Sequence, residues 1–454
     1  MLIHKIKYFA NKTPEKQAVV YKGKSATYGE LWSEIKQRTI GISKIAEKNL
    51  LLSKSNEYEN LVNFLAGLAI EKASIFVSKH QNESQLNELQ KKNSAFLIDN
   101  KFEFDSYDIE SPIQETAVKK HKTNNKQQQS TLFLGVLTSG TTNTPNLIWK
   151  DYQSWFTAFP HQSSVFGIDE TNKLFVLDAL SYSANLNSVL HMLWLGGTVV
   201  LTSIQTANTW AQQIEKEQIS SIFMVPSHYR LLLQTDPNLG QIKSILSAGE
   251  KLDQATAEGL LKAAPNALLT EYYGSAELGH ITFHQGNDII SNPLSVGKAF
   301  PEVNIKLKND QIFVESPYIS PEYRKKSTNF DLGYFIDDAL ILVGRAGRMF
   351  NRRGLNIFAE EIENVVKKLP YIFEAAAVGI LKADNSHNIF LAYSCKNEFK
   401  NNTYNSQIIK YLANHLQATK IPQRLLEFEN LPRTTFGKID FKALARTFEE
   451  AIFA

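Results

Sequence analysis

The sequence predicts an α/β protein with a large N-terminal domain of layered sheets and helices, a β-rich subdomain, and a small α+β C-terminal domain. Short apolar runs alternate with helical periodicity over most of the first 300 residues, which is typical of βα units and a largely parallel sheet. From about Val303 the pattern changes to short strands, and beyond Met349 a compact tail of domain size follows. We therefore expect domains at 1–348 and 349–454.

Composition excludes several classes of protein. A chain of 454 residues with 43% hydrophobic and 21% charged residues is an ordinary globular protein with room for a large core. Its formal net charge of +3 is too small to indicate nucleic-acid binding. Cys395 is the only cysteine, which excludes an intrachain disulfide and a cysteine metal site, and fits a reducing, cytoplasmic location.

From the distribution of apolar residues we expect neither an export signal nor a membrane-spanning segment. Residues 1–10 are too short and too interrupted by lysine for a signal peptide. No window approaches eighteen uninterrupted apolar residues, so we expect no membrane span.

The N-terminal part of the chain reads as alternating helices and strands. We expect a helix that ends near Pro14, a hairpin around Lys22 and Gly23, and a second helix that opens at Tyr28. A helix over 60–69 and strands over 73–77 and 95–98 follow, and the wholly polar segment 121–130 reads as a linker.

A hydroxyl-rich loop follows the apolar strand predicted at 131–137. Side-chain hydroxyls and the backbone N–H groups that a glycine exposes can hold phosphate oxygens without burying a fixed charge. The loop lacks the Gly-Lys pair of the G-x-x-x-x-G-K-[ST] class, and a plain Ser/Thr-rich surface turn is the alternative. The candidate phosphate-binding residues are Thr138, Ser139, Gly140, Thr141 and Thr142.

The middle of the chain continues the alternation. We expect a helix over 152–166 and another over 189–195 that stops at Gly196 and Gly197. Strands are expected at 173–177, 198–201, 221–225 and 245–246, and in the β-rich part at 304–307 and 311–314.

Two carboxylates stand beside glycine-bearing turns. Glu277, in the segment 271–279, has the chemistry to ligate the Mg²⁺ that accompanies ATP phosphates, and the alternative is an ordinary turn glutamate. Asp331 has the chemistry to accept both ribose hydroxyls of a nucleotide, and the alternative is a turn aspartate.

Several motifs, in order along nearly the whole chain, resemble the adenylate-forming superfamily of acyl-CoA synthetases, peptide-synthetase adenylation domains and luciferases. The loop from Thr138 resembles T-S-G-T-T-x-x-P. The chain departs from that motif at Asn143, where the family has Gly, and at Asn146, where it has a phosphate-contacting Lys. Lys150, four residues on, is the candidate to supply the missing charge.

The resemblance also implies roles around the nucleotide. The segment 271–279 resembles Y-G-x-T-E, so Tyr273 and Gly274 would lie near adenine and Glu277 would meet the metal, although Ala276 replaces the family's Thr. Asp331 matches the ribose-binding Asp of T-G-D-x-G-Y, where Phe330 replaces Gly.

The longest match, residues 344–363, resembles the junction of the family's two domains. It implies that Arg345 contacts ribose and phosphate, that Arg348 stands at the hinge, and that Gly354 lines the channel for the thiol substrate. Near the C-terminus, residues 431–440 resemble P-R-T-x-x-G-K-I, which makes Lys438 the catalytic lysine. A mobile ammonium there would approach the α-phosphate and the carboxylate nucleophile together.

The resemblance implies an ATP-dependent acid–thiol ligase that uses ATP, Mg²⁺ and, as thiol, CoA. The acid would be a fatty or other small carboxylic acid, and not an α-amino acid, because residues 181–187 carry no carboxylate for an α-ammonium group. Two alternatives stay open: loading of an acyl or peptidyl carrier protein, and a degenerate nucleotide- or acyl-binding protein without turnover. His191 and His280 near the site are expected to be packed or solvated residues rather than catalysts, and Cys395, in an apolar strand, is expected to be in the core.

Overall fold

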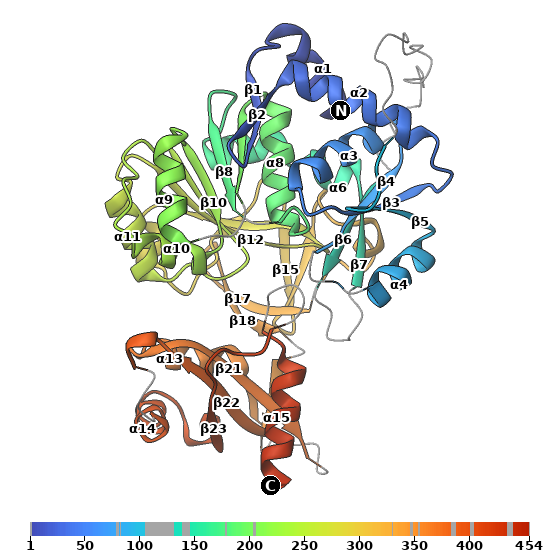
Figure 1. Cartoon of the computed structure of the whole chain (residues 1–454). Helices are drawn as coiled ribbons and strands as arrows, with labels where there is room; N and C mark the ends of the chain where they lie inside the picture. The colour runs from blue at the N-terminus through green and yellow to red at the C-terminus, as the bar shows by residue number, and fades with distance from the viewer. Residues whose placement is uncertain are drawn as a thin grey trace.

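The computed structural model describes most of the chain, namely residues 2–78, 81, 83–104, 131–138, 146–177, 179–202, 206–328, 330–345, 348–352, 355–382, 387–399, 404–433 and 439–453. The fold class expected from the sequence is confirmed: a large part with several sheets is followed by a small C-terminal part (Figure 1). None of the described helices has the length and hydropathy that crossing a bilayer would need.

The N-terminus folds as expected into a helix, a hairpin and a second helix. Thr27 and Glu30 form a capping box at the start of the second helix: Glu30 N–H donates to Thr27 Oγ1 (3.2 Å) and Thr27 N–H donates to the Glu30 carboxylate (2.8 Å). The elements are α1 (Leu2–Lys12), β1 (Gln17–Tyr21), β2 (Lys24–Thr27) and α2 (Tyr28–Ser43).

A five-stranded sheet of order β5-β3-β4-β6-β7 carries the predicted phosphate-loop strand. Its first four strands are parallel, and β7 pairs antiparallel with β6. The strands and their helices are β3 (Asn49–Ser53), α3 (Glu57–Ala69), β4 (Ala73–Phe76), α4 (Glu83–Asn93), β5 (Ala95–Asp99), β6 (Leu132–Thr138) and β7 (Asn146–Asp151).

A nine-stranded sheet of order β14-β13-β12-β11-β10-β8-β9-β1-β2 forms the other half of the large part. Its central strands are parallel and its edges antiparallel. The strands are β8 (Lys173–Leu177), β9 (Thr198–Thr202), β10 (Ser221–Met224), β11 (Ser244–Ser247), β12 (Leu268–Ser275), β13 (Gly279–Gln285) and β14 (Lys298–Ala299). The helices are α8 (Ser183–Leu195), α9 (Ala207–Lys216), α10 (Pro226–Leu233), α11 (Gln254–Ala263) and α12 (Asp288–Ser291).

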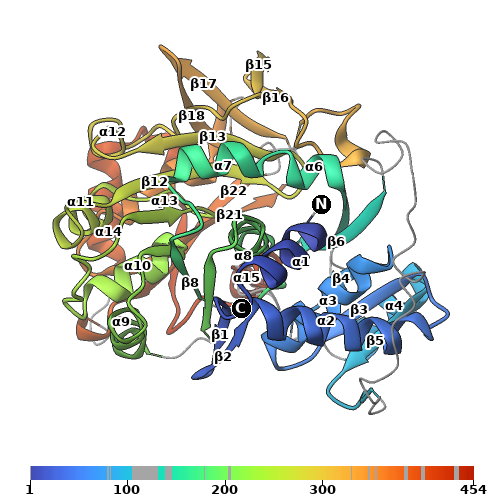
Figure 2. The same cartoon turned by 90° about the horizontal axis from the view of Figure 1, so that it is seen from above.

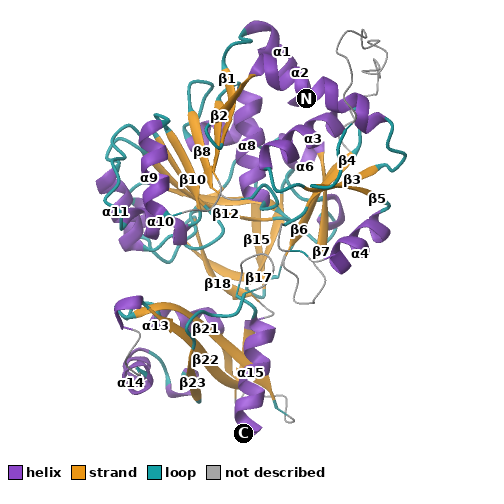
Figure 3. Ribbon diagram, in the orientation of Figure 1, coloured by secondary structure: helices purple, strands orange, loops and turns teal. Residues whose placement is uncertain are grey.

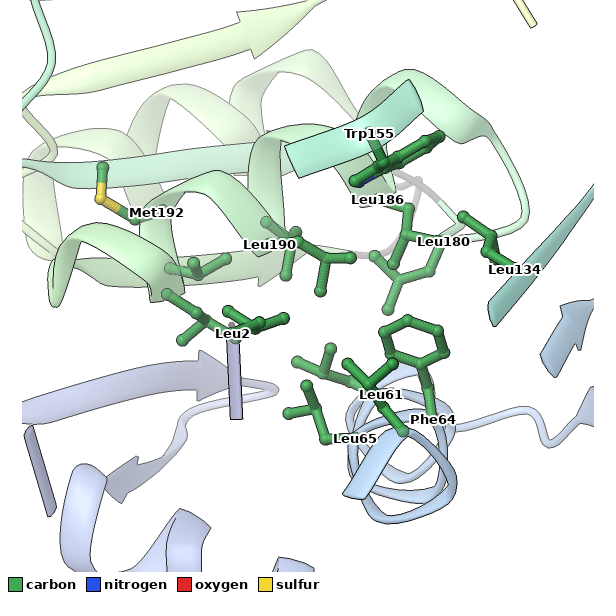
Figure 4. Packing of buried hydrophobic residues seen from close by; sticks show 14 of the residues in the cluster. Leu2, Leu61, Phe64, Leu65, Leu134, Trp155, Leu180, Leu186, Leu190 and Met192 are labelled. Carbon is green, nitrogen blue, oxygen red and sulfur yellow. The ribbon is translucent and has the colours of Figure 1, made fainter. Parts of the chain in front are cut away.

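One apolar layer joins the two sheets. α1 and α8 lie between them (Figure 2), and Leu2, Leu61 and Leu190 belong to the same buried cluster. Figure 4 shows Leu186 and Leu190 of α8 gathered with Leu61 and Phe64 of α3. Each such fully buried side chain contributes roughly 1.5–3 kcal/mol relative to exposure, so the layer holds the two sheets together.

The sequence prediction of one helix over 152–166 is wrong. The structure has two short helices, α6 (Tyr152–Phe156) and α7 (Phe159–Phe166), separated at Thr157 and Ala158. Pro160 lies in the first turn of α7, where its missing N–H costs nothing, whereas inside a continuous helix its ring would clash with the carbonyl of Phe156.

The β-rich subdomain expected after Val303 is confirmed as a four-stranded sheet of order β15-β16-β17-β18 with an apolar cluster of its own. Its elements are β15 (Asn304–Lys308), β16 (Gln311–Glu315), the 3₁₀ turn η1 (Pro321–Tyr323), β17 (Asp331–Ile336) and β18 (Ala339–Arg345).

The small C-terminal part packs three helices and a three-stranded sheet around two apolar clusters whose described members all lie beyond residue 349 (Figure 3). Cys395 is buried in one of these cores, as expected, and burial raises the pKa of its thiol to about 12. The elements are β19 (Met349–Arg352), β20 (Leu355–Phe358), α13 (Ala359–Val366), β21 (Ile372–Leu381), β22 (His387–Cys395), η3 (Asn397–Phe399), α14 (Asn405–His415), η4 (Ala418–Lys420), β23 (Arg424–Glu427) and α15 (Phe441–Phe453).

Candidate active site

Three of the predicted nucleotide-binding residues meet where β12 approaches the β17–β18 hairpin. The Tyr273 hydroxyl on β12 donates a hydrogen bond to the Asp331 carboxylate at the start of β17. In the antiparallel register Asp331 lies directly opposite Arg345, the last residue of β18. Asp331 is only 4% exposed, so its carboxylate is a fixed acceptor rather than a solvated surface charge. An aromatic face beside a buried carboxylate suits a nucleoside.

Glu277 lies, as expected, in a turn, which joins β12 to β13. Residues 271–275, the first part of the segment, belong to strand β12 itself. The turn is anchored at its backbone, because the Ser320 N–H donates to the Glu277 carbonyl (2.8 Å). Gly274 is required by close packing, since a Cβ there would lie 2.4 Å from the Gly279 carbonyl oxygen. The hairpin itself therefore explains Gly274.

Glu277 is chemically suited to Mg²⁺ that arrives with a nucleotide. Mg²⁺ in proteins is usually held by one or two carboxylates, with phosphate oxygens and waters completing its shell. The described residues contain no group of three or more His, Cys, Asp or Glu side chains placed to hold a metal without such help. The half-buried Glu277 therefore fits the one protein ligand that such an ion needs.

The phosphate loop is described only at its two edges. Thr138 ends β6, and its hydroxyl donates to the Asn146 carbonyl (3.4 Å) at the start of β7. Ser139, Gly140, Thr141 and Thr142, together with Asn143, lie outside the described residues. Asn146 is exposed, so nothing in its surroundings prevents a longer side chain.

Lys150 is buried in the same sheet. It lies on β7 opposite Leu134, is 2% exposed, and its ammonium stands 5.8 Å from the centre of the Trp155 ring. Burial lowers the pKa of Lys150 to about 8, and the charges of Glu277 and Asp151 oppose that shift. The side chain therefore remains mainly a cation at neutral pH.

A buried polar cluster lies beside this region, between α7, α8 and β13. The Gln162 amide donates to Asn187 Oδ1 (2.5 Å) and contacts His280 Nε2, while Gln162 Oε1 has no partner. Burial lowers the pKa of His280 to about 3, and the charge of Lys150 adds to the effect. Burial likewise lowers the pKa of His191 to about 3. Both histidines are packed and neutral, as expected.

The backbone at Phe330 adopts a conformation that favours glycine. Its φ of +65° lies in the left-handed region, which costs a residue with a Cβ roughly 1 kcal/mol or more. The Phe330 N–H donates to Thr328 Oγ1 (3.0 Å), and the ring itself is 56% exposed. The backbone turn of the family's motif is thus kept although its glycine is not.

The junction of the two parts is held by Arg348. Its guanidinium binds Glu360 (2.8 Å) and Glu363 (2.5 Å) of α13 and lies 4.1 Å from the centre of the Phe441 ring. Two other predicted residues of this region, Gly354 and Lys438, lie outside the described residues, as does the side chain of Arg345.

Sequence reasoning missed the roles of Gln162 and Asn187 in the polar cluster. The available signal was the unusual composition of α8, where Asn185, Asn187 and His191 are buried on a helix that is otherwise apolar. A polar residue on every face of a buried helix indicates an internal site, because buried polar groups require partners.

Comparison with known proteins agrees with this geometry. The family described as AMP-binding enzyme matches residues 62–317, more than half of the chain. An uncharacterized acyl–CoA ligase, YhfT of Bacillus subtilis, is 29% identical over 69% of this chain and 68% of its own. A putative long chain fatty acid-CoA ligase, VraA of Staphylococcus epidermidis, is 25% identical over 98% and 97% of the two chains.

Solved structures share the fold over almost the whole chain. The O-succinylbenzoate coenzyme A synthetase MenE of Bacillus subtilis, solved with AMP, superposes with a TM-score of 0.82 at 18% identity over 97% of both chains. MatB of Rhodopseudomonas palustris, solved with ATP, gives 0.81 at 17% identity over 99% of this chain and 100% of its own. The chain belongs to the AMP-binding enzyme family.

Proposed function

We propose that the protein is an ATP-dependent acid–CoA ligase that activates a fatty or other carboxylic acid through an acyl-AMP intermediate, with release of pyrophosphate. The observation that carries the proposal is the hydrogen bond from Tyr273 to the buried Asp331 opposite Arg345, with the Glu277 turn at the end of the same strand β12. This arrangement supports a nucleoside on one side and its metal-bound phosphates on the other.

In the proposed first step a carboxylate oxygen of the acid attacks the α-phosphorus of ATP. The bond from that phosphorus to the bridging oxygen of pyrophosphate breaks, and acyl-AMP forms. Asp331 would hold the ribose, Thr138 and the loop hydroxyls would hold phosphate oxygens, and Lys438 would meet the developing charge. Mg²⁺ held by Glu277 would supply charge neutralisation at the phosphates.

In the proposed second step the CoA thiolate attacks the acyl carbon, the acyl–phosphate bond breaks, and AMP leaves. By resemblance, Gly354 would leave room for the pantetheine arm, and the small domain would turn about a hinge near Arg348. We keep the boundary at 348/349 and a reducing compartment as parts of this proposal. Loading of a carrier-protein thiol shares the first step and differs only in this one.

The acid is proposed not to be an α-amino acid. The segment 181–187 contributes no carboxylate, and the Asn185 side chain is already bound to the Leu177 and Ala179 carbonyls (2.8 and 3.1 Å). An α-ammonium group buried beside these residues would lack a counter-charge. A screen of fatty, aromatic and amino acids with ATP, read as pyrophosphate and thioester, checks this, and preference for an amino acid would overturn it.

Two variants test whether the half-reactions separate. Lys438→Ala is expected to lose acyl-AMP formation by at least about 10²-fold, the usual effect of removing one charge-stabilising donor, yet to convert supplied acyl-AMP to thioester. Gly354→Leu is expected to do the reverse, because a branched side chain would fill the thiol channel. Single-turnover formation of acyl-AMP and acyl-CoA, measured for wild type and both variants, gives the result.

Three outcomes count against the proposal. Normal adenylation by Lys438→Ala, or loss of the same step in both variants, would refute the two-orientation mechanism. Absence of pyrophosphate release from wild type with any acid would favour the degenerate binding protein, for which Asn143, Asn146 and Ala276 are the motivating departures. Transfer of the acyl group to a carrier protein, but not to CoA, would identify the carrier-protein thiol as the acceptor.

A further inference from the structure

Lys150 is a buried cation whose ammonium lies 5.8 Å from the centre of the Trp155 ring and has no anionic partner among the described residues. Across the part of the chain that the structure describes, its ammonium makes no hydrogen bond and no ion pair. The neighbouring Asp151 is already engaged by Arg324 (2.7 Å) and by the Ser154 N–H (2.9 Å). A buried charge costs several kcal/mol unless something opposes it, so the position calls for an explanation beyond packing.

Among the neighbouring charges, the Glu277 carboxylate does most to raise the pKa of Lys150 against the lowering by burial. β7 packs against η1, and Ser320, the residue before η1, binds both carbonyls of the metal turn: its N–H donates to Glu277 O (2.8 Å) and its hydroxyl to Ala276 O (2.8 Å). The backbone thus fixes the Glu277 turn beside β7. Within the described residues, no ion pair joins the Lys150 ammonium to the Glu277 carboxylate.

Lys150 does not simply replace the family's loop lysine at position 146. Both positions lie on one face of β7, but four residues of strand span about 13 Å, more than a lysine side chain covers. The ammonium therefore cannot stand where a lysine at position 146 would place its charge.

We propose that Lys150 is a positioning residue that acts as the resident counter-ion of Glu277, holding this carboxylate inward and neutralising it until metal and nucleotide arrive. The inference rests on the proposed function of the site. Its physical consequence is specific: a neutralised Glu277 does not repel metal-free ATP, and it attracts Mg²⁺ less than a lone carboxylate would.

Calorimetric binding of three ligands tests this: ATP with EDTA, ATP with Mg²⁺, and AMP. Lys150→Met is expected to weaken the binding of metal-free ATP about tenfold or more, because the Glu277 carboxylate then has no cation to offset its charge. The affinity for Mg²⁺-bound ATP should change by less than about threefold. The affinity for AMP, which lacks the β- and γ-phosphates, should not change. Lys173→Met is the control, since Lys173 is already paired with Glu217 (2.9 Å).

The decisive measurement is rescue. Adding Glu277→Gln to Lys150→Met should restore the affinity for metal-free ATP, and Glu277→Gln alone should raise it above wild type. The single Glu277 variant keeps Lys150, so the test stands even if Lys150→Met fails to fold. A merely structural lysine would lower the affinity for all three ligands equally and would not be rescued.

Other outcomes are equally informative. If Lys150→Met weakens both forms of ATP alike and Glu277→Gln does not restore them, Lys150 contacts phosphate directly and the counter-ion role is overturned. If only binding of the acid substrate weakens, the ammonium serves the acid's carboxylate, which also overturns it. If wild type binds neither ATP nor AMP, the proposed function fails and not merely this inference.

Discussion

Two lysine–glutamate pairs flank the β12–β13 hairpin, and one is closed while the other is open. Lys251 Nζ lies 2.5 Å from Glu271 Oε2, and the Leu252 N–H donates to Glu271 Oε1 (2.6 Å). Lys150 and Glu277, by contrast, form no ion pair with each other among the described residues. The closed pair satisfies its own charges and is structural, whereas the open pair leaves both charges available to a ligand.

Breaking the closed pair should have the largest effect. Lys251→Met leaves the Glu271 carboxylate, only 3% exposed, without its cation, and removal of one partner of a buried pair costs about 3–5 kcal/mol. Urea unfolding at pH 7 measures the loss, with Lys251→Arg as the control that keeps the charge. Equal stability of Lys251→Met and wild type would remove the distinction between the two pairs.

Removing the lysine of the open pair should instead raise the free energy of unfolding. Lys150→Met exchanges a buried ammonium for an apolar side chain of similar length, and so removes the desolvation cost that lowers the pKa of Lys150 from 10.5 to about 8, which corresponds to roughly 3 kcal/mol. The same urea transition, followed without nucleotide, is expected at a higher midpoint than in wild type. A lower midpoint would mean that Lys150 is needed for folding itself.

His280, which lies beside the open pair, should make the free energy of unfolding depend on pH. The pKa of His280 is lowered from 6.5 to about 3 by burial and by Lys150, so the folded protein resists a proton that the unfolded chain accepts. This contribution is complete above pH 6.5 and is lost as pH falls toward 3, by roughly 1.4 kcal/mol per pH unit. Between pH 6.5 and 5, His280→Gln should lose about 2 kcal/mol less than wild type. Parallel stability–pH curves would contradict the assignment.

A new cation on the phosphate loop should have the smallest effect. Asn146→Lys restores the family's residue at an exposed position and is expected to lower the KM for ATP by up to about tenfold, since exposed charge contacts are weak. Steady-state kinetics in wild type and in the Lys150→Met background give the comparison. An unchanged KM in wild type, with a gain only in the double variant, would show that Lys150 already provides the charge.

Sequence patterns predicted the elements far better than the directions of individual side chains. Alternating apolar runs were sufficient for β4 to β6 and β8 to β11, because parallel strands buried on both faces are uniformly apolar. The motifs placed Tyr273 and Asp331 in one site, and a hydrogen bond joins the two side chains in the structure, while their role in nucleotide binding stays a prediction.

The inward direction of Lys150 was beyond prediction. It depends on the register of β7 against β6, and a shift of one residue would turn the side chain to the other face of the sheet. Gln162 and Asn187 meet through the packing of α7 against α8, a long-range contact that no local pattern encodes.

Arg348 has a mechanical consequence. Its guanidinium is bound to Glu360 and Glu363 and stacked on Phe441, all of them in the small domain. A swing of that domain would therefore carry Arg348 along as part of the moving body.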